Sequence, residues 1–194
     1  MRKRWDLAVP RIELLQKELK RELYKRRFRR ILRSSFNALI VVAAVAALIA
    51  TLLLPVLQIA GTSMEPSLND GDIVVLAKTD RLQNGDLCAF YYSNKILIKR
   101  IIGVPGDYIW INNEGTVYVN NQELDEPYVS EKALGECDLE FPYQVPENYY
   151  FMMGDHRKTS IDSRSSVIGC IAEDQMIGKI LCRFWPLSEF QWIG

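Results

Sequence analysis

The chain has 194 residues, of which 48% are hydrophobic and 25% charged, so it is not wholly disordered and has room for one domain of ordinary size. Its net charge is zero, but residues 1–33 carry 13 Lys and Arg against 4 Asp and Glu, whereas residues 34–194 carry 11 against 20. We infer that the two parts face different surroundings.

The N-terminal segment, residues 1–34, is predicted to be a basic amphipathic tail. Apolar residues recur there at spacings of three and four, which is typical of a helix with one apolar face; they are Ile12, Leu15, Leu19 and Leu23. We expect the tail to contact the anionic lipid headgroups of a bilayer, with a signal that only sets orientation as the alternative for its Lys and Arg. Nucleic acid is not an expected partner, because interleaved aromatic residues and a known reading module are lacking.

A long apolar run follows the tail. Residues 36–57 read FNALIVVAAVAALIATLLLPVL and contain no charge, which is long enough to cross roughly 30 Å of hydrocarbon as a helix. We predict a transmembrane helix over residues 35–57 and expect Pro55 to stop it. A cleaved signal peptide is disfavoured, because the run is too long and Gln58-Ile59-Ala60 lacks the second small residue of a cleavage site.

The basic flank of this run predicts its orientation, since Lys and Arg next to a span stay in the cytoplasm. We therefore expect a single-pass protein of the cell membrane, with a cytoplasmic N-terminus and residues 58–194 outside. All four cysteines lie in this outer part, where disulfides are permitted: Cys88, Cys137, Cys170 and Cys182. Their spacings match neither a CxxC pair nor a zinc site, so disulfides and free buried thiols both stay open.

Short β-type runs alternate with turn signals beyond the span. The predicted strands are Ile73–Ala77, Leu87–Tyr92, Ile96–Ile102, Tyr108–Ile111, Thr116–Val119, Tyr149–Met153 and Ile177–Phe184. With no long amphipathic helix among them, the pattern predicts a mainly β fold, an antiparallel sandwich or partly open barrel. Residues 122–147 contain three prolines and are expected to form a long irregular excursion that covers a sheet edge.

Ser63 is a candidate nucleophile, because it lies between small and flexible neighbours just beyond the apolar run. A serine hydroxyl needs a base, and the usual base is histidine. His156 is the one histidine of the chain, so a triad with Asp155 or Asp162 is formally available. A lone histidine in a polar loop is, however, more often a surface or structural residue.

Lys99 is the competing base. It lies in the apolar strand Ile96–Ile102, and period-two alternation places Lys99 and Arg100 on opposite faces of a sheet. Burial disfavours a charged ammonium group and lowers its pKa, so a shielded Lys99 could accept a proton. An isolated strand lysine can also extend to an edge or join a salt bridge.

Four motifs occur in order in the outer part of the chain. They are Gly61-x-Ser63-Met64-x-Pro66-Ser67-Leu68, Gly71-Asp72, Lys99-Arg100-x-x-Gly103-x-Pro105-Gly106-Asp107 and Gly154-Asp155-x-Arg157-x-x-Ser160-x-Asp162-Ser163-Arg164. Over roughly residues 55–187 they closely resemble the bacterial type I signal peptidases. The short stretch between Asp107 and Gly154 is similar to the compact form of many Gram-positive relatives, and Lys99 differs from the histidine of endoplasmic-reticulum relatives.

The resemblance implies a membrane-anchored serine endopeptidase that removes signal peptides from exported preproteins with a Ser/Lys dyad. Ser63 is then the nucleophile, Lys99 the general base, and residues 58–194 the catalytic domain. Ser160 matches the serine that hydrogen-bonds and positions the lysine. A supporting polar scaffold, which we expect to form ion pairs, is matched by Arg100, Asp155, Asp162 and Arg164. Neither a metal nor another cofactor is expected.

The backbone N–H of Ser63 is the expected oxyanion donor, because the oxyanion forms on the carbon that Ser63 attacks. Two residues depart from the family. Gly61 stands where some relatives carry a serine whose hydroxyl is a second donor, so that donor must come from elsewhere or be absent. His156 stands where asparagine is common, and we expect it to be a tolerated variant.

A signal peptide is extended at its cleavage region, so we expect it to add to an exposed strand edge through main-chain hydrogen bonds. The resemblance implies small substrate residues at positions −1 and −3. Our candidates for the pocket walls are Ile59, Met64 and Ile98, with ordinary core packing as an equal alternative for Met64. An aromatic cluster near the C-terminus suits either a membrane interface or the core; it consists of Phe184, Trp185, Phe190 and Trp192.

Two rival functions stand beside the peptidase. A catalytically silent relative would serve as a membrane-tethered assembly or chaperone module, and loss of the serine or the lysine would favour it. A self-cleaving regulator with the same dyad is disfavoured by the span and by the lack of a DNA-binding segment. The sequence predicts no oligomeric state.

Overall fold

The computed structural model of the chain describes residues 12–79 and 81–193. The chain divides into two compact units, Met1–Ala50 and Thr51–Gly194, which are described separately. Residues 1–11 of the predicted basic tail lie outside the described residues.

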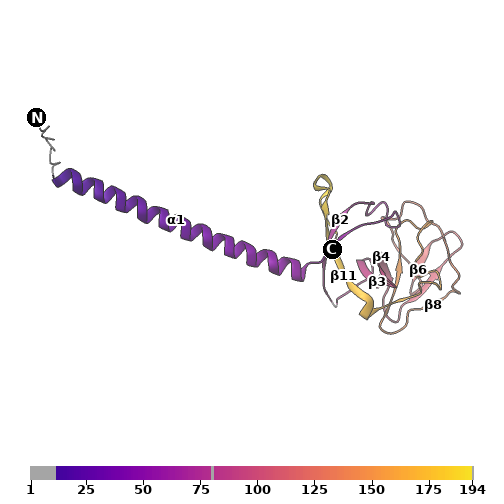
Figure 1. Cartoon of the computed structure of the whole chain (residues 1–194). Helices are drawn as coiled ribbons and strands as arrows, with labels where there is room; N and C mark the ends of the chain where they lie inside the picture. Colours follow the sequence, from indigo (N-terminus) through magenta and orange to yellow (C-terminus); the bar gives the residue numbers. More distant parts are fainter. Residues whose placement is uncertain (1–11, 80, 194) are drawn as a thin grey trace, which may run out of the picture. The chain divides into compact units, whose positions relative to one another are not determined.

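Among the described residues, the first unit is helix α1, which runs from Ile12 to Leu53 and ends beyond the boundary of this unit (Figure 1). The predicted basic helix and the predicted apolar span form this one continuous helix. By length and composition α1 is able to cross a membrane. The predicted span ended at Leu57, and the structure corrects that bound. Pro55 has no backbone N–H to continue a helix, and Val56–Gln58 form strand β1 instead.

The second unit is built from two antiparallel sheets (Figure 1). The larger has eight strands in the order β1-β2-β11-β3-β4-β9-β10, with β12 paired to β11. Its strands are β1 (Val56–Gln58), β2 (Ile73–Ala77), β3 (Leu87–Tyr92), β4 (Lys95–Gly103), β9 (Tyr149–Met153), β10 (Ile171–Ala172), β11 (Met176–Trp185) and β12 (Gln191–Trp192). The predicted mainly antiparallel β fold is confirmed.

The smaller sheet has four strands in the order β7-β6-β5-β8. These strands are β5 (Tyr108–Ile111), β6 (Val117–Val119), β7 (Gln122–Glu123) and β8 (Tyr143–Gln144). The predicted irregular excursion over residues 122–147 is therefore partly wrong, because β7 and β8 lie within it and pair with β6 and β5. Elsewhere in the described part of this unit, the helical segments after α1 are two short 3-10 turns, η1 (Glu173–Gln175) and η2 (Leu187–Glu189).

Strand β4 occupies a central position that matters for the site. It pairs with β3 along Lys95–Arg100, whereas its pairing with β9 begins only at Arg100. The main chain of β4 before Arg100 therefore has no strand partner on its β9 side within the described residues. An open strand edge of this kind is able to accept an extended peptide.

Three apolar clusters hold the second unit together. The first packs Ile59, Met64 and Leu68, which flank Ser63, against side chains of β2, β3 and β11. The second fills the space between β4, β9 and the smaller sheet, and the third lies around Phe90 and Ile101. The segment that carries Ser63 is thus fixed by burial of its own apolar residues.

The structure shows the state of the four cysteines and the environment of the C-terminal aromatic cluster. All four cysteines are free, and Cys88 and Cys182 are buried. The aromatic cluster does not join the core, because about half or more of each side chain is exposed: Phe184 is 49% exposed, Trp185 49%, Phe190 48% and Trp192 68%.

Candidate active site

Ser63 lies in a turn between β1 and β2, and we call residues 60–71 the Ser63 loop. The base of this loop is closed by two main-chain hydrogen bonds. Ile59 N–H donates to the Asp72 carbonyl oxygen at 2.7 Å, and Gly71 N–H donates to the Ile59 carbonyl oxygen at 3.0 Å. Burial of Met64 and Leu68 below the turn leaves the Ser63 side chain partly exposed at its rim.

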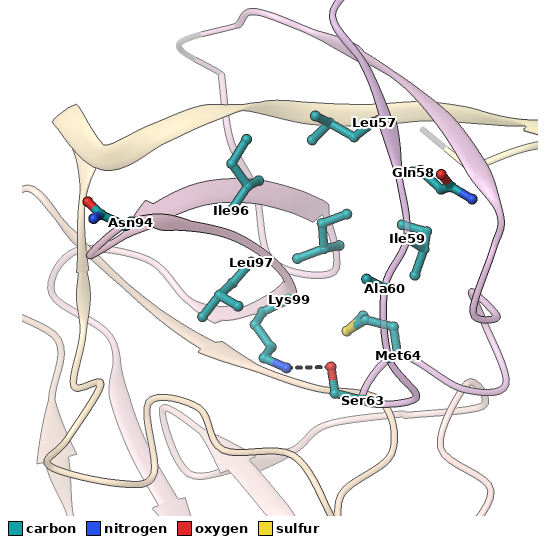
Figure 2. A pocket seen from close by; sticks show the side chains of 12 residues that line it. Leu57, Gln58, Ile59, Ala60, Ser63, Met64, Asn94, Ile96, Leu97 and Lys99 are labelled. Atoms are coloured by element: carbon teal, nitrogen blue, oxygen red, sulfur yellow. Dashed lines mark hydrogen bonds between the residues drawn. The ribbon is translucent and has the colours of Figure 1, made fainter.

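Lys99 reaches Ser63 from the central strand β4. Its Nζ lies 2.7 Å from Ser63 Oγ, and Figure 2 shows the two side chains pointing toward each other. Lys99 is only 4% exposed. Burial lowers the pKa of Lys99 from its ordinary 10.5 to about 8; Asp162 and Asp155 oppose this shift, and Arg164 adds to it. The two predicted residues therefore lie within hydrogen-bonding distance, and the lowered pKa makes a far larger fraction of the Lys99 amine neutral near physiological pH than an ordinary lysine has.

His156 is arranged differently from a catalytic base. Its Nδ1 lies 2.8 Å from Thr159 Oγ1, and it is the backbone N–H of His156 that donates to the Ser63 carbonyl oxygen, at 3.1 Å. The two aspartates considered for a triad accept hydrogen bonds from arginines, Asp155 from Arg100 and Asp162 from Arg164. The geometry therefore gives Ser63 a lysine partner and no Ser-His-Asp triad.

Ser160 is buried beside the dyad, but the hydrogen bond expected from it to Lys99 is not formed in this structure. Ser160 Oγ has no hydrogen-bond partner among the residues described. Ser160 can approach Ser63 closely because residue 154 is a glycine. A Cβ at that position would lie 2.2 Å from Ser160 Oγ and 2.5 Å from the Ser63 carbonyl oxygen. Ser160, Gly154 and Ser63 thus meet without room for one additional methyl group.

Arg100 and Asp155 form the first ion pair of the expected scaffold. Arg100 donates from Nε and Nη2 to the two carboxylate oxygens of Asp155, at 2.9 and 2.6 Å. Arg100 also donates to Ser67 Oγ at 3.2 Å, and its guanidinium lies over the ring of Tyr128 at 3.8 Å. A planar guanidinium suits such bidentate and stacked contacts. This pair joins β4 to the Ser63 loop and to the loop after β9.

Asp162 and Arg164 form the second expected ion pair, in which neither side chain is exposed. The carboxylate of Asp162 accepts from Arg164 Nε at 2.8 Å and from Gly154 N–H at 2.9 Å. Arg164 also donates to the carbonyl oxygens of Ala133 and Leu134. The pair therefore fixes the Gly154 backbone and binds the irregular stretch before β8.

A third ion pair was missed by the sequence analysis. The side chains of Arg157 and Glu126 are completely buried and bind each other through both arginine Nη atoms. Arg157 Nε donates to the Gly154 carbonyl oxygen at 3.0 Å. Gly154 is therefore held from both sides, by Asp162 at its N–H and by Arg157 at its carbonyl. Glu126 comes from the excursion 122–147, in which no periodic pattern marks it as buried.

The surroundings of the oxyanion position bear on the role of Gly61. Gly61 has a φ of +98°, a conformation that L residues rarely adopt, and its N–H donates to Asp70 Oδ1 at 2.7 Å. The Gly61 amide is thus engaged elsewhere. The N–H of Ser63 has no acceptor in the described part of the chain, which leaves it available to a ligand.

A cavity of about 390 Å³ opens next to the dyad (Figure 2). Its walls are the stretch from Leu57 to Gly61 on one side and Asn94 with the stretch from Ile96 to Lys99 on the other, with Ser63 and Met64 at one end. All three predicted wall residues, Ile59, Met64 and Ile98, line it. Met64 also belongs to the first apolar cluster, so the two alternatives for this residue are both realised.

The described residues contain no group of three or more His, Cys, Asp or Glu placed to hold a metal ion.

Comparisons with known proteins identify the family of this chain. A family model described as "Signal peptidase, peptidase S26" matches residues 32–185. Signal peptidase IB of Staphylococcus aureus (strain MRSA252) is 37% identical over 154 residues, which cover 69% of this chain and 79% of that protein. Signal peptidase I of Bacillus licheniformis is 35% identical over 168 residues, which cover 80% of this chain and 89% of that protein.

A solved structure of a signal peptidase I from Enterococcus faecalis V583 is similar to part of this chain. The alignment covers 53% of this chain and 98% of the Enterococcus chain, at 25% sequence identity and a TM-score of 0.44. The extent of the family match and the identity to the two relatives decide the classification. The chain belongs to the signal peptidase family, peptidase S26.

Proposed function

We propose that this chain is a serine peptidase that cleaves signal peptides from preproteins, with Ser63 as nucleophile and neutral Lys99 as general base. The observation that carries the proposal is the 2.7 Å contact between Lys99 Nζ and Ser63 Oγ at a lysine that is only 4% exposed. A lysine activates a serine only when its amine is neutral, and burial is what lowers its pKa to about 8.

The reaction follows from this contact. Lys99 Nζ takes the Ser63 hydroxyl proton as Oγ attacks the scissile carbonyl carbon of the substrate. The resulting ammonium then gives that proton to the leaving amine as the peptide bond breaks, which releases the mature protein and leaves the signal peptide as an ester on Ser63. A water molecule, deprotonated by the same amine, hydrolyses the ester and restores the hydroxyl.

The unengaged N–H of Ser63 supports its role as an oxyanion donor. A serine hydroxyl at position 61 is absent, and the Gly61 N–H is engaged with Asp70, so Gly61 supplies no second donor in this arrangement. Loss of one such donor costs about 2.7–4 kcal/mol of transition-state stabilisation where nothing replaces it.

We assign Ser160 and the three ion pairs to positioning. Ser160 Oγ packs against Gly154 beside the dyad and has no partner in the described residues, so it is free to receive a hydrogen bond from Lys99 when the amine turns away from Ser63. Because the ion pairs of Arg100, Arg157 and Arg164 hold the Gly154 backbone and the Ser63 loop, they act through these neighbours and not on the substrate.

The cavity and the open edge of β4 support the way in which we expect a substrate to bind. An extended signal peptide would lie between the Leu57–Gly61 stretch and the unpaired edge of β4 before Arg100, with its scissile bond at Ser63. Side chains of Ile59, Met64 and Ile98 would form shallow apolar pockets for the small residues at positions −1 and −3.

Membrane attachment completes the proposal. Helix α1 would span the bilayer once, with its basic N-terminal part in the cytoplasm against anionic headgroups and the β unit outside. The exposed aromatic residues between Phe184 and Trp192 would lie at the membrane interface, where Trp side chains are favoured.

The silent assembly or chaperone module is not favoured. Such a relative has no need of a serine hydroxyl in contact with a buried lysine, and both groups are present and in hydrogen-bonding distance.

The test is cleavage of a preprotein by the full chain in detergent micelles. We expect Ser63→Ala and Lys99→Ala to lose activity and His156→Ala, the matched control in the same site region, to keep most of it. An inactive His156→Ala together with an active Lys99→Ala would make the dyad assignment wrong. No cleavage by the unaltered chain would remove the proposed activity itself.

A further inference from the structure

Arg183 lies on β11, far along the sequence from the dyad, and is 8% exposed. Its Nη1 lies 3.1 Å from Asp72 Oδ2, and Asp72 is 3% exposed. This ion pair is therefore almost completely removed from water. It is the one buried ion pair in the described residues that does not belong to the network around Gly154 or to the Arg100 site.

Asp72 is the residue at the base of the Ser63 loop. Its carbonyl oxygen accepts the Ile59 N–H at 2.7 Å, and its carboxylate oxygen Oδ2 accepts the Asn69 N–H at 2.9 Å. One aspartate thus fixes the start of the loop through its backbone and the end of the loop through its side chain. The same Oδ2 is the atom that receives Arg183.

The direction of the Arg183 guanidinium is set by the C-terminal hairpin, residues 184–192. Nε donates to the Glu189 carbonyl oxygen at 3.0 Å, and Nη2 donates to Gln191 Oε1 at 3.4 Å. Glu189 Oε2 lies a further 3.4 Å from Nη1. The hairpin therefore contacts all three nitrogens of the Arg183 guanidinium, and the contact outside the hairpin is with Asp72.

We propose that Arg183 is a positioning residue of the reaction, which holds the Ser63 loop in its catalytic geometry by neutralising Asp72 at the base of that loop. This inference rests on the proposed function. Without the arginine, a buried carboxylate would lose its counter-charge and would be stabilised by moving toward water. The Ile59 and Asn69 amides that it holds would move with it, and so would Ser63 and the wall residue Ile59.

The expected loss is large for a residue that does not touch the substrate, because a displacement of about 1 Å at a reacting group can cost about 100-fold in rate. We expect Arg183→Gln and Asp72→Asn each to lower kcat/KM by about 10- to 100-fold in the folded full chain. Because both changes break the same contact, the double variant should lose no more than the larger single loss. Arg183→Lys, which keeps the charge, should recover part of the activity.

Lys179→Gln is the matched control. Lys179 lies on the same strand and forms an ion pair with Asp86 at 2.7 Å, but it is 25% exposed and does not contact the Ser63 loop. Its loss should change kcat/KM by less than about twofold, as for an ion pair that water partly screens.

A second readout does not depend on activity. Amide hydrogen exchange at Ile59 and Gly71, which close the base of the loop, should be at least about tenfold faster in Asp72→Asn and Arg183→Lys than in the unaltered chain. Lys179→Gln should leave it unchanged. Because these two variants are conservative, they decide the matter even where Arg183→Gln does not fold.

The inference is overturned if the conservative variants keep the protection of both amides, or if folded Arg183→Gln retains kcat/KM within about twofold and loses only thermal stability. Additive losses in the double variant would also overturn it. Cleavage by the unaltered chain and none by Ser63→Ala, with full activity in every Arg183 variant, would leave the proposed function intact and reject this inference alone.

Discussion

Gly154→Ala is the change that tests the packing of the site most sharply. Gly154 does not adopt a positive φ, so the added methyl group, and not backbone strain, is the perturbation. Its Cβ would lie 2.2 Å from Ser160 Oγ and 2.5 Å from the Ser63 carbonyl oxygen, whereas real Cβ contacts essentially never fall below 3.0 Å. Relief therefore requires shifts of roughly 0.8 and 0.5 Å.

The structure also says which groups must move. Gly154 cannot retreat, since its N–H is bound to Asp162 and its carbonyl to Arg157. The Ser160 side chain can turn, but the Ser63 carbonyl oxygen belongs to the backbone and carries the nucleophile with it. A shift of this size at the nucleophile should lower kcat/KM by about 10- to 100-fold.

The assay is preprotein cleavage by the full chain in micelles, with circular dichroism to verify folding. Gly169→Asn is a suitable control, because Gly169 has a φ of +64° that asparagine tolerates and a Cβ there meets nothing within 4 Å. Activity of Gly154→Ala within about twofold of the unaltered chain would refute the packing argument.

Two further predictions concern stability. Lys99→Met should abolish cleavage and raise Tm, most clearly below pH 8. Because the pKa of Lys99 is lowered from 10.5 to about 8 by folding, the folded chain binds fewer protons than the unfolded chain between about pH 8 and 10.5, and the stability of the unaltered chain rises with pH in that window. Below pH 8 the cost of burying the charged amine is fully present, and the methionine removes it. Equal Tm values at all pH would contradict this. Asp155→Asn should lower the free energy of unfolding by about 3 kcal/mol, measured by denaturant titration, because it leaves the largely buried Arg100 without its counter-charge; an unchanged midpoint would contradict it.

Many of the strands could be predicted from the local pattern of apolar residues and turn signals. Strands β2, β3, β5 and β9 have the predicted bounds, because alternating apolar residues and turn signals are local properties of the sequence. The strands that were missed, such as β7, β8, β10 and β12, have two residues each. Their existence depends on a neighbouring strand that the local sequence does not describe.

Some features of the candidate site likewise follow from the sequence, whereas others depend on residues that are far apart in the chain. The burial of Lys99 follows from its apolar strand, and its partnership with Ser63 was implied by the resemblance of the motifs to the signal peptidases. The partnership of Arg157 with Glu126 joins residues 31 positions apart, and no spacing rule links them. The left-handed backbone of Gly61 and the lack of a partner for Ser160 are likewise three-dimensional facts that residue types alone do not contain.

Gly61 illustrates why residue identity and local geometry must be considered together. By residue type alone, a glycine at position 61 means only the loss of a hydroxyl donor. The structure adds a reason for the glycine, because a φ of +98° is strained for any L side chain, even though a Cβ would meet nothing within 4 Å. A serine placed at this position would first have to change the backbone of the Ser63 loop.

Activation of Ser63 by a neutral Lys99 is tested by the pH dependence of kcat/KM for preprotein cleavage. With a pKa of about 8, about one Lys99 amine in eleven is neutral at pH 7, so kcat/KM should rise about tenfold from pH 7 to a plateau above pH 9. Lys99→Arg, whose guanidinium cannot release its proton, should be inactive throughout. A kcat/KM that stays flat from pH 6 to 10, or an active Lys99→Arg, would show that neutral Lys99 is not the general base.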